Sequence, residues 1–328
     1  MELNLLKKLC AIHGPSGRES GVTAVIAEEI KGLVDSCEID AMGNLIAHKK
    51  GPGKKMMLAG HADQIGLMVT HITKEGFLYF SMIGGMRPLY TMGQRFIFPN
   101  GTVAIANCEG EVALKDLAFN KMYLDIGAKD EEAAKKLVKV GDIGVFNNEP
   151  VINGETFMSM ALDDRIGCFI MIEALKQLKK SAFDLYFVFT SQEELGLRGA
   201  RTAAYGVNPD YGLAFDVTIA ADTPKGPKLP SKMGDGAAIK IKDASLICHP
   251  KMVAHLEKCA IEGKIKHQFE ILEAGGTDSG AIQLNMSGVP SGVISIATRH
   301  VHSANEMVAI SDIEDCVALT VRVLETEI

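Results

Sequence analysis

Apolar residues follow helical spacing and strand-like runs in alternation near both ends of this chain. Residues 3–9 and 22–33 repeat apolar side chains at helical intervals, and two strand-like runs follow them, separated by the turn Gly51-Pro52-Gly53. The alternation resumes after Asp163 and continues to the C-terminus, which is typical of an α/β domain. The predicted strands are 37–46, 56–60, 185–189, 211–215 and 292–296, and the predicted helices of the second part are 166–179 and 251–262.

The middle of the chain has a different pattern. From residue 67 to residue 155, short β-branched or aromatic stretches alternate with Gly, Pro and Asn, as in a small β-barrel or sandwich. One helix is predicted there, at 130–138, with Asp130 as its N-cap. The sequence therefore predicts a mixed-sheet α/β catalytic domain from residues 1–66 and 156–328, with an inserted all-β, barrel-like domain at 67–155. A last helix is expected after the capping-box pattern Ser311-Asp312-Ile313-Glu314.

Composition and charge narrow the class of protein. The 328 residues are 47% hydrophobic, which is enough to form a core without disulfides or a structural metal. The net charge of -7 argues against a nucleic-acid partner. Residues 1–8 lack the apolar stretch of a signal peptide and no run is long enough to span a membrane, so we expect a cytoplasmic protein. Seven cysteines without a Cys-x-x-Cys pair are expected to be reduced, mostly buried thiols.

Candidate metal ligands follow several of the predicted strands. In open α/β sheets, ligands collect beyond the carboxyl ends of the strands, so these side chains are expected to converge. Two histidines and several carboxylates in one crevice are the ligand set of a dinuclear metal site. The candidates are His61 and Asp63 after 56–60, Glu193 and Glu194 after 185–189, Asp216 after 211–215, His300 and His302 after 292–296, and Asp163 and Asp164 at the start of a helix.

Each candidate also has an ordinary structural explanation. His61 could simply satisfy a backbone group, but Asp63, two residues on in an extended chain, could accept its second ring N–H and leave the other nitrogen free for a metal. Asp163 and Asp164 could cap a helix, and Asp216 could cap a turn. Either histidine of the His-x-His pair could be the ligand. The occurrence of so many of these residues at strand ends, with Asp163 and Asp164 at the start of a helix, favours the metal site.

Other catalytic signatures are missing from the sequence. It has no Gly-x-Ser-x-Gly elbow, His-Glu-x-x-His helix, Walker loop or Gly-x-Gly-x-x-Gly fingerprint. The glycine-rich segment Gly275-Gly276-Thr277-Asp278-Ser279-Gly280 is interpreted as a loop that lines a substrate cleft.

The motifs together closely resemble the M42 family of metallo-aminopeptidases, in order and along nearly the whole chain. This family includes glutamyl and deblocking aminopeptidases and the tetrahedral TET peptidases, and many members carry an endoglucanase name. The residues that carry the resemblance are Gly60-His61-Ala62-Asp63-Gln64-Ile65-Gly66, Ala161-Leu162-Asp163-Asp164-Arg165, Gln192-Glu193-Glu194-Leu195-Gly196, Phe215-Asp216-Val217-Thr218, Gly275-Gly276-Thr277-Asp278 and His300-Val301-His302-Ser303. Gln64 departs from the acidic residue that is frequent in relatives, without changing the number of ligands.

The resemblance implies a role for each of these residues. His61 and Asp216 would hold one divalent cation, Glu194 and His302 a second, and Asp163 would bridge them. Glu193 would be the general base toward a metal-bridging water, and Asp63 would orient His61. The metals would be zinc or cobalt. The resemblance also implies peptide substrates, a β-rich insertion used for dimerisation, and a homo-oligomer, commonly a dodecamer built from dimers.

Three other functions are weighed against an aminopeptidase. An endoglucanase, as the family's other name suggests, would need opposed carboxyl groups and aromatic platforms, and this chain has no Trp and 6% aromatic residues. A non-catalytic scaffold would be expected to have lost a ligand or the base. An M20-type acylase or carboxypeptidase shares the dinuclear site, but the contexts of Asp163 and His302 favour M42.

Overall fold

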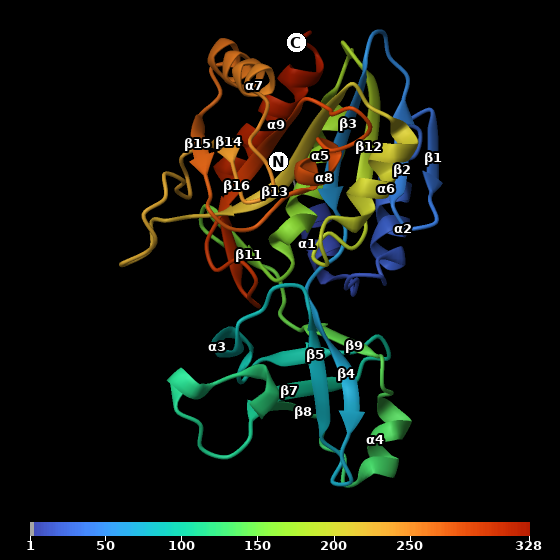
Figure 1. The fold of residues 1–328 in the computed structure, drawn as a ribbon, viewed down its shortest axis with the longest axis vertical. Coiled ribbons are helices and arrows are strands. Elements are labelled where there is room, and N and C mark those ends of the chain that lie inside the picture. The colour runs from blue at the N-terminus through green and yellow to red at the C-terminus, as the bar shows by residue number, and fades with distance from the viewer. Residues whose placement is uncertain (1–2) are drawn as a thin grey trace.

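The computed structural model describes residues 3–328 and shows a sheet-and-helix lobe with a separate barrel below it (Figure 1). Met1 and Glu2, which open the predicted catalytic domain, lie outside the described residues. The fold class predicted from the sequence, a mixed-sheet α/β domain with an inserted all-β barrel, is confirmed. Within residues 3–328, no helix combines the length and the apolar character needed to cross a bilayer.

The large lobe is built on one eight-stranded sheet. Its centre, β12-β3-β13-β16, is parallel, while β2 and β14 join it in antiparallel fashion at either side. In spatial order the strands are β1 (Ser36–Ile39), β2 (Leu45–Lys49), β12 (Asp184–Thr190), β3 (Lys55–His61), β13 (Tyr211–Ile219), β16 (Ser291–Thr298), β14 (Ala237–Lys242) and β15 (His267–Ile271). A smaller three-stranded sheet consists of β10 (Val151–Asn153), β11 (Thr156–Ser159) and β17 (Glu306–Ala309).

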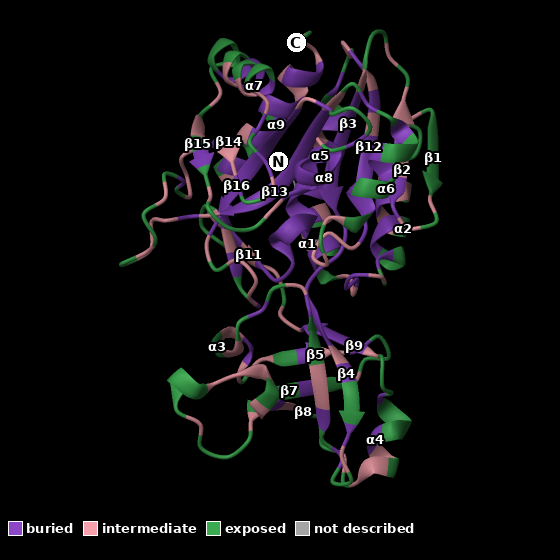
Figure 2. Cartoon of the chain, in the orientation of Figure 1, coloured by how far each residue is buried: buried purple, intermediate pink, exposed green. Residues whose placement is uncertain are grey.

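Helices cover both faces of the large sheet. The main core packs α1, α2, α5 and α9 on one face, and a second apolar cluster packs α6 and α8 on the other. Both faces are therefore closed to water, and buried residues fill the central strands (Figure 2). The helices are α1 (Asn4–Ala11), α2 (Ser20–Glu29), α3 (Pro88–Thr91), α4 (Glu131–Leu137), α5 (Leu162–Gln177), α6 (Arg198–Val207), α7 (Pro250–Gly263), α8 (Asp278–Ile282) and α9 (Ile310–Leu324).

The barrel is closed by six antiparallel strands between residues 66 and 146. Its strands alternate inward and outward side chains, most clearly in β7, where Ala104 and Ala106 point into an apolar core that also holds Phe96 and Phe146. Around the barrel the strands are β4 (Gly66–Ile72), β5 (Leu78–Ile83), β8 (Met122–Asp125), β7 (Val103–Cys108), β6 (Arg95–Ile97) and β9 (Ile143–Phe146), with short 3₁₀ helices at Leu114–Asp116 and Phe119–Lys121.

Three local predictions are corrected by the structure. The predicted strand 37–46 is two strands, because the Asp40 carboxylate accepts the main-chain N–H groups of Met42 and Asn44 and turns the chain. The strand predicted to end before Asp216 continues to Ile219. The capping box at the last helix is absent: α9 begins at Ile310 with no side-chain cap.

The carboxylate of Asp312 does not cap its own helix but forms hydrogen bonds with a distant segment of the chain. It accepts the N–H groups of Gly234 and Gly236, at 2.7 and 2.9 Å. Two other local predictions are confirmed. Asp130 caps α4 by accepting the N–H of Ala133, and all seven cysteines are free thiols, most of them buried.

Candidate metal centre

Strand register aligns the candidate residues at the carboxyl edge of the sheet. Thr190, which precedes the Glu193-Glu194 turn by three residues, pairs with His61. On the other side of β3, Ala214 pairs with Ala59, so Asp216 lies level with His61 two residues further along both strands. Parallel pairing therefore gathers side chains from segments far apart in the chain.

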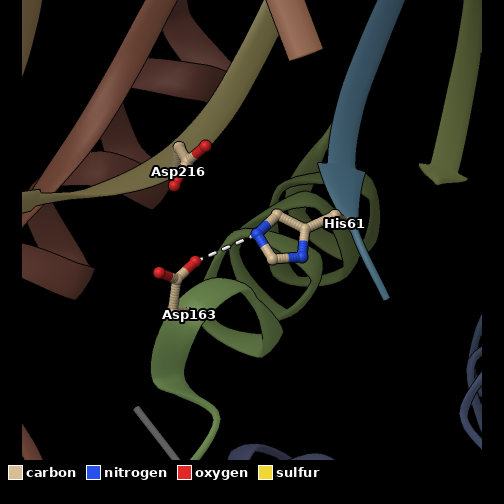
Figure 3. A group of neighbouring side chains, drawn as sticks. All are labelled: His61, Asp163 and Asp216. Carbon is tan, nitrogen blue, oxygen red and sulfur yellow. Dashed lines mark hydrogen bonds and ion pairs between the residues drawn. The ribbon is translucent and has the colours of Figure 1, made fainter. Parts of the chain in front are cut away.

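His61, Asp163 and Asp216 form the first group of possible ligands (Figure 3). His61 Nε2 lies 2.9 Å from Asp163 Oδ1, and one ligand atom from each of the three side chains falls within 4.8 Å of the others. All three residues are buried. His61 comes from the end of β3 and Asp216 from β13. Asp163 comes from the start of α5, where its backbone is not yet helical.

A second group contains Asp163, Glu194 and His302. His302 Nε2 lies 3.1 Å from Asp163 Oδ2 and 3.3 Å from Glu194 Oε1. The two oxygens of the Asp163 carboxylate thus face the two histidines separately, one in each group. His300, the other histidine of the His-x-His pair, lies apart from both groups and lines a surface hollow with Leu89 and Tyr90.

Glu193 lies beside these groups without joining either one. Its Oε2 is 3.8 Å from His61 Nε2, its side chain is 11% exposed, and it lines the adjoining cleft. Consecutive side chains of a strand would point to opposite faces. Gln192, with a φ of 52°, turns the chain before them, and both Glu193 and Glu194 face the centre.

Asp63 connects His61 to the turn that carries the two glutamates. The ring Nδ1 of His61 lies 3.3 Å from the main-chain oxygen of Asp63 and 3.5 Å from its carboxylate Oδ1. The carboxylate accepts the N–H groups of Glu193 and Glu194, at 3.0 and 3.2 Å, and the hydroxyl of Ser16 at 2.6 Å. Asp63 therefore holds the main chain of both glutamates as well as lying beside the histidine.

Glu306 is a buried residue of the centre that the sequence analysis did not identify. Its carboxylate accepts the N–H of Asp163 at 3.0 Å and that of His302 at 2.8 Å. It thus fixes two ligand-bearing segments, as Asp63 does on the other side. The available signal was a single glutamate in the otherwise apolar strand β17, four residues after His302.

Asp164 and Arg165 follow Asp163 in the chain and hold neighbouring segments of the centre by hydrogen bonds. Asp164 accepts the N–H of His61 and that of Gly167 in the first turn of α5, as a cap would. Arg165 is fully buried and donates to the main-chain oxygens of Leu9 and Gly14 and to Gln64 Oε1 at 3.0 Å. Gln64, the residue that departs from the family pattern, thus contacts Arg165.

The carboxylates of the centre are crowded and desolvated. Burial raises the pKa values of Glu193, Asp216 and Asp164 well above their usual range, and neighbouring carboxylates raise them further. Burial also raises the pKa of Asp278, beside the same group, to about 6. Burial alone would lower the pKa of His302, but its contacts with Asp163 and Glu194 raise it to about 12.

This arrangement fits divalent cations. Imidazole nitrogens and carboxylate oxygens are ligands that zinc and cobalt accept, and the buried carboxylates outnumber the two imidazoles. Glu194 Oε1 is buried and has no hydrogen-bond partner apart from its ion-pair contact with His302 Nε2 at 3.3 Å, so it is available to a cation. Positive charge at the two groups would offset the repulsion that raises the pKa values of the acids.

A cleft of about 600 Å³ opens beside the centre. Its walls include Asp163, Glu193, Glu194, Asp216 and His302. Gly275, Gly276 and Thr277 line the same cleft, as expected for the glycine-rich loop. The cleft therefore gives a ligand direct access to both groups.

Known proteins match this chain over almost its whole length. The profile of the M42 glutamyl aminopeptidase family matches residues 43–319. A putative aminopeptidase of Acetivibrio thermocellus is 48% identical, with 98% of each chain covered.

Solved structures of aminopeptidases share the fold, among them the two that follow. An aminopeptidase from the archaeon Desulfurococcus kamchatkensis superposes with a TM-score of 0.96 at 38% identity, covering 99% of this chain and 94% of its own. The TET1 peptidase of Pyrococcus horikoshii, described as assembling into a tetrahedron or a large octahedral shell, gives a TM-score of 0.87 at 31% identity with 98% of each chain covered. On this evidence the chain belongs to the M42 family of aminopeptidases and is a peptide hydrolase.

Proposed function

We propose that this protein is a dinuclear metal-dependent aminopeptidase that removes residues one at a time from the free amino end of peptides. The observation that carries the proposal is the placement of Asp163, whose two carboxylate oxygens face His61 and His302 separately. His61 and Asp216 would hold one cation, Glu194 and His302 the other, and Asp163 would bridge them. Zinc or cobalt suits these ligands.

Two such cations, when bound, supply a Lewis acid for the scissile carbonyl and lower the pKa of a water molecule. Glu193 would act as the general base, accepting a proton at Oε2 and returning it to the leaving amine. Its place on the cleft wall, outside both ligand groups, supports this role. Asp63 would orient the imidazole of His61 and hold the Glu193 main chain in position.

The cleft favours a peptide over a polysaccharide. A glycoside hydrolase binds sugar rings on aromatic platforms, and among the described residues the cleft is lined by no Phe, Tyr or Trp side chain. An M20-type acylase or carboxypeptidase would share the metal chemistry, but it would act on blocked or carboxyl ends. A free α-amino group is the feature that separates these reactions.

The test uses peptides that differ only in their ends. After chelation and reconstitution with zinc or cobalt, we expect stepwise shortening of a free peptide and resistance of its N-acetylated form. Full activity in protein shown to be metal-free by elemental analysis would rule out the metal mechanism. Efficient cleavage of the acetylated peptide, or release of reducing sugar from carboxymethylcellulose, would overturn the aminopeptidase assignment.

We also propose that the protein is a homo-oligomer, a dodecamer built from dimers that contact through the barrel. The reported assembly of the TET1 peptidase into closed shells supports this. Exposed apolar side chains on the barrel, among them Leu89, Val103, Ile105 and Leu114, are available for such contacts. Light scattering that finds a fully active monomer at micromolar concentration would overturn the assembly and leave the metal centre untouched.

A further inference from the structure

The cleft beside the metal centre has mostly apolar walls. Besides the residues of the centre, it is lined by the side chains of Met86, Leu197, Val217, Ile219, Leu272 and Val301. Away from the centre, two charged residues line the cleft: Lys240 on β14, which is buried, and Arg87, which is exposed to solvent. Lys240 is therefore the charged residue of the buried wall away from the metals, and Arg87 lies where water can screen its charge.

Lys240 is buried with two acidic partners. Its side chain is 1% exposed and forms ion pairs with Glu270 on β15 and, at 3.6 Å, with Asp243. Both acids are fully buried. Burial would lower the pKa of Lys240, but the two acids raise it above its usual value, so the ammonium stays charged.

Both acids are also engaged by other groups. Glu270 accepts the hydroxyl of Thr218 at 2.8 Å on the oxygen that pairs with Lys240. Asp243 accepts the N–H groups of Ser245 and Leu246, at 2.7 and 2.9 Å. Neither acid is among the residues that line the cleft. The positive charge of Lys240 is thus balanced by two carboxylates that do not line the cleft.

This cluster rejects both kinds of charged side chain. An entering carboxylate would meet an ammonium whose charge is already balanced by two carboxylates. An entering ammonium would find no acid in the cleft wall away from the metal centre, because Glu270 and Asp243 do not line the cleft. A charge that enters a low-dielectric cleft without a partner loses its hydration uncompensated, whereas an aliphatic side chain gains apolar contacts.

We infer that the cleft selects peptides whose N-terminal residue is uncharged and aliphatic, and that the Lys240–Glu270–Asp243 cluster is the specificity-determining element. This inference rests on the proposed function, because it takes the N-terminal side chain to be the group that enters the cleft while the scissile bond lies at the metal centre.

The first experiment compares kcat/KM for leucyl, methionyl, glutamyl and lysyl p-nitroanilides on zinc- or cobalt-reconstituted enzyme. We expect the two aliphatic substrates to exceed both charged substrates by at least about tenfold. A glutamyl or lysyl preference would overturn the inference and leave the proposed function standing. Turnover of none of the four would overturn the proposed function and this inference with it.

Two variants should move the charge preference in opposite directions. Glu270→Gln removes one negative charge behind Lys240 and should raise the glutamyl-to-leucyl ratio of kcat/KM by about tenfold. Lys240→Met leaves two uncompensated acids and should raise the lysyl-to-leucyl ratio instead. Glu273→Gln, the same change at an exposed position three residues after Glu270, is the matched control and should alter neither ratio.

Thermal melting and metal content establish that each variant is folded and loaded before its ratios are compared. If Lys240→Met does not fold, the glutamyl-to-leucyl ratio of the Glu270→Gln variant is the test of the inference. An unchanged glutamyl-to-leucyl ratio in folded, metal-loaded Glu270→Gln enzyme would overturn the assignment of specificity to this cluster, whereas a purely structural role would lower all four rates together and leave the ratios fixed.

Discussion

The carboxyl edge of the large sheet buries many polar and charged side chains, whereas the interior of the barrel buries almost none. The sheet edge buries His61, Asp63, Asp163 and Asp216 within one small region. Between residues 66 and 146, all of which the structure describes, Thr91 is the only buried polar or charged residue. Buried charge therefore concentrates where parallel strands end, and the closed barrel keeps a dry core.

The difference follows from the two kinds of sheet. Parallel strands all end at one edge, so loops from distant parts of the chain meet there with free main-chain N–H groups that can stabilise carboxylates. In the barrel, every strand has two neighbours and its inward side chains fill the interior. A buried carboxylate there would have no comparable donors and would cost stability.

The two regions nevertheless touch at the loop after β5. A Cβ atom on Gly84 would lie 2.5 Å from Ile65 Cγ2 and 2.8 Å from Glu194 Oε2, and one on Gly85 would lie 3.1 Å from His302 Nδ1. The barrel side thus supplies no ligand to the candidate centre, yet its backbone packs directly against two of the proposed ligands. Mutations at the sheet edge, in the barrel core and at this loop should therefore have separate effects on catalysis, on stability and on the contact between the two regions.

The largest effect is expected from the two glutamates at the sheet edge. Glu193→Gln should keep both metals and lose turnover by about 10²–10⁴-fold, the range for general-base catalysis. Glu194→Gln should instead lose metal, because it removes a ligand carboxylate. Elemental analysis alongside kcat distinguishes the two, and equal metal loss in both variants would contradict the proposed roles.

A cavity in the barrel should affect stability without affecting chemistry. Phe96 is fully buried against Phe146, with ring centroids 4.7 Å apart, so Phe96→Ala should lower the free energy of unfolding by about 3–5 kcal/mol. Denaturant unfolding measures the loss, and Leu114→Ala, at a position 71% exposed, is the control. A change in metal content of the folded Phe96→Ala protein would show that the regions are more tightly coupled than we describe.

The contact between the regions can be tested with two glycines of equal backbone conformation. Gly84 and Gly93 have φ values of 78° and 77°, but a Cβ on Gly93 would meet nothing within 4 Å. Alanine at either position should cost about 1–2 kcal/mol of stability through the left-handed backbone, and Gly84→Ala should cost more because its Cβ would also clash with Ile65. Only Gly84→Ala should also lower kcat/KM, by about tenfold, because it displaces Glu194. Equal activity in the two variants would show that the loop does not position this ligand.

The smallest effect concerns pH at the junction of the lobes. His13 Nε2 donates to the main-chain oxygen of Ile143 in β9 at 2.9 Å, and burial lowers the pKa of His13 below its ordinary 6.5. The unfolded chain then binds the proton more readily than the folded chain, so stability rises with pH up to about 6.5 and is lost as pH falls below it. His13→Gln keeps a donor without titrating, and its unfolding free energy should fall less on acidification. A parallel pH profile for both proteins would remove His13 as the cause.

Periodicity predicted most of the architecture because burial imposes it locally. The apolar runs at 185–189 and 292–296 fall within β12 and β16, and the helix after Asp130 forms with the expected cap. Errors arose where a polar side chain had a second possible partner. Asp40 turns the chain between β1 and β2, and Asp312 binds two distant N–H groups in place of its own helix end.

The sequence by itself determined which residue types stand at the strand ends and at the start of the helix after residue 162. It therefore determined the candidates His61, Asp163, Glu193, Glu194, Asp216 and His302. It left His300 and His302 equivalent on local grounds, and it gave no reason to single out Glu306 or to pair Lys240 with Glu270. Tertiary structure decided these points, because the charge balance of a buried group depends on partners that come from other strands and loops, and sequence spacing does not encode those distances.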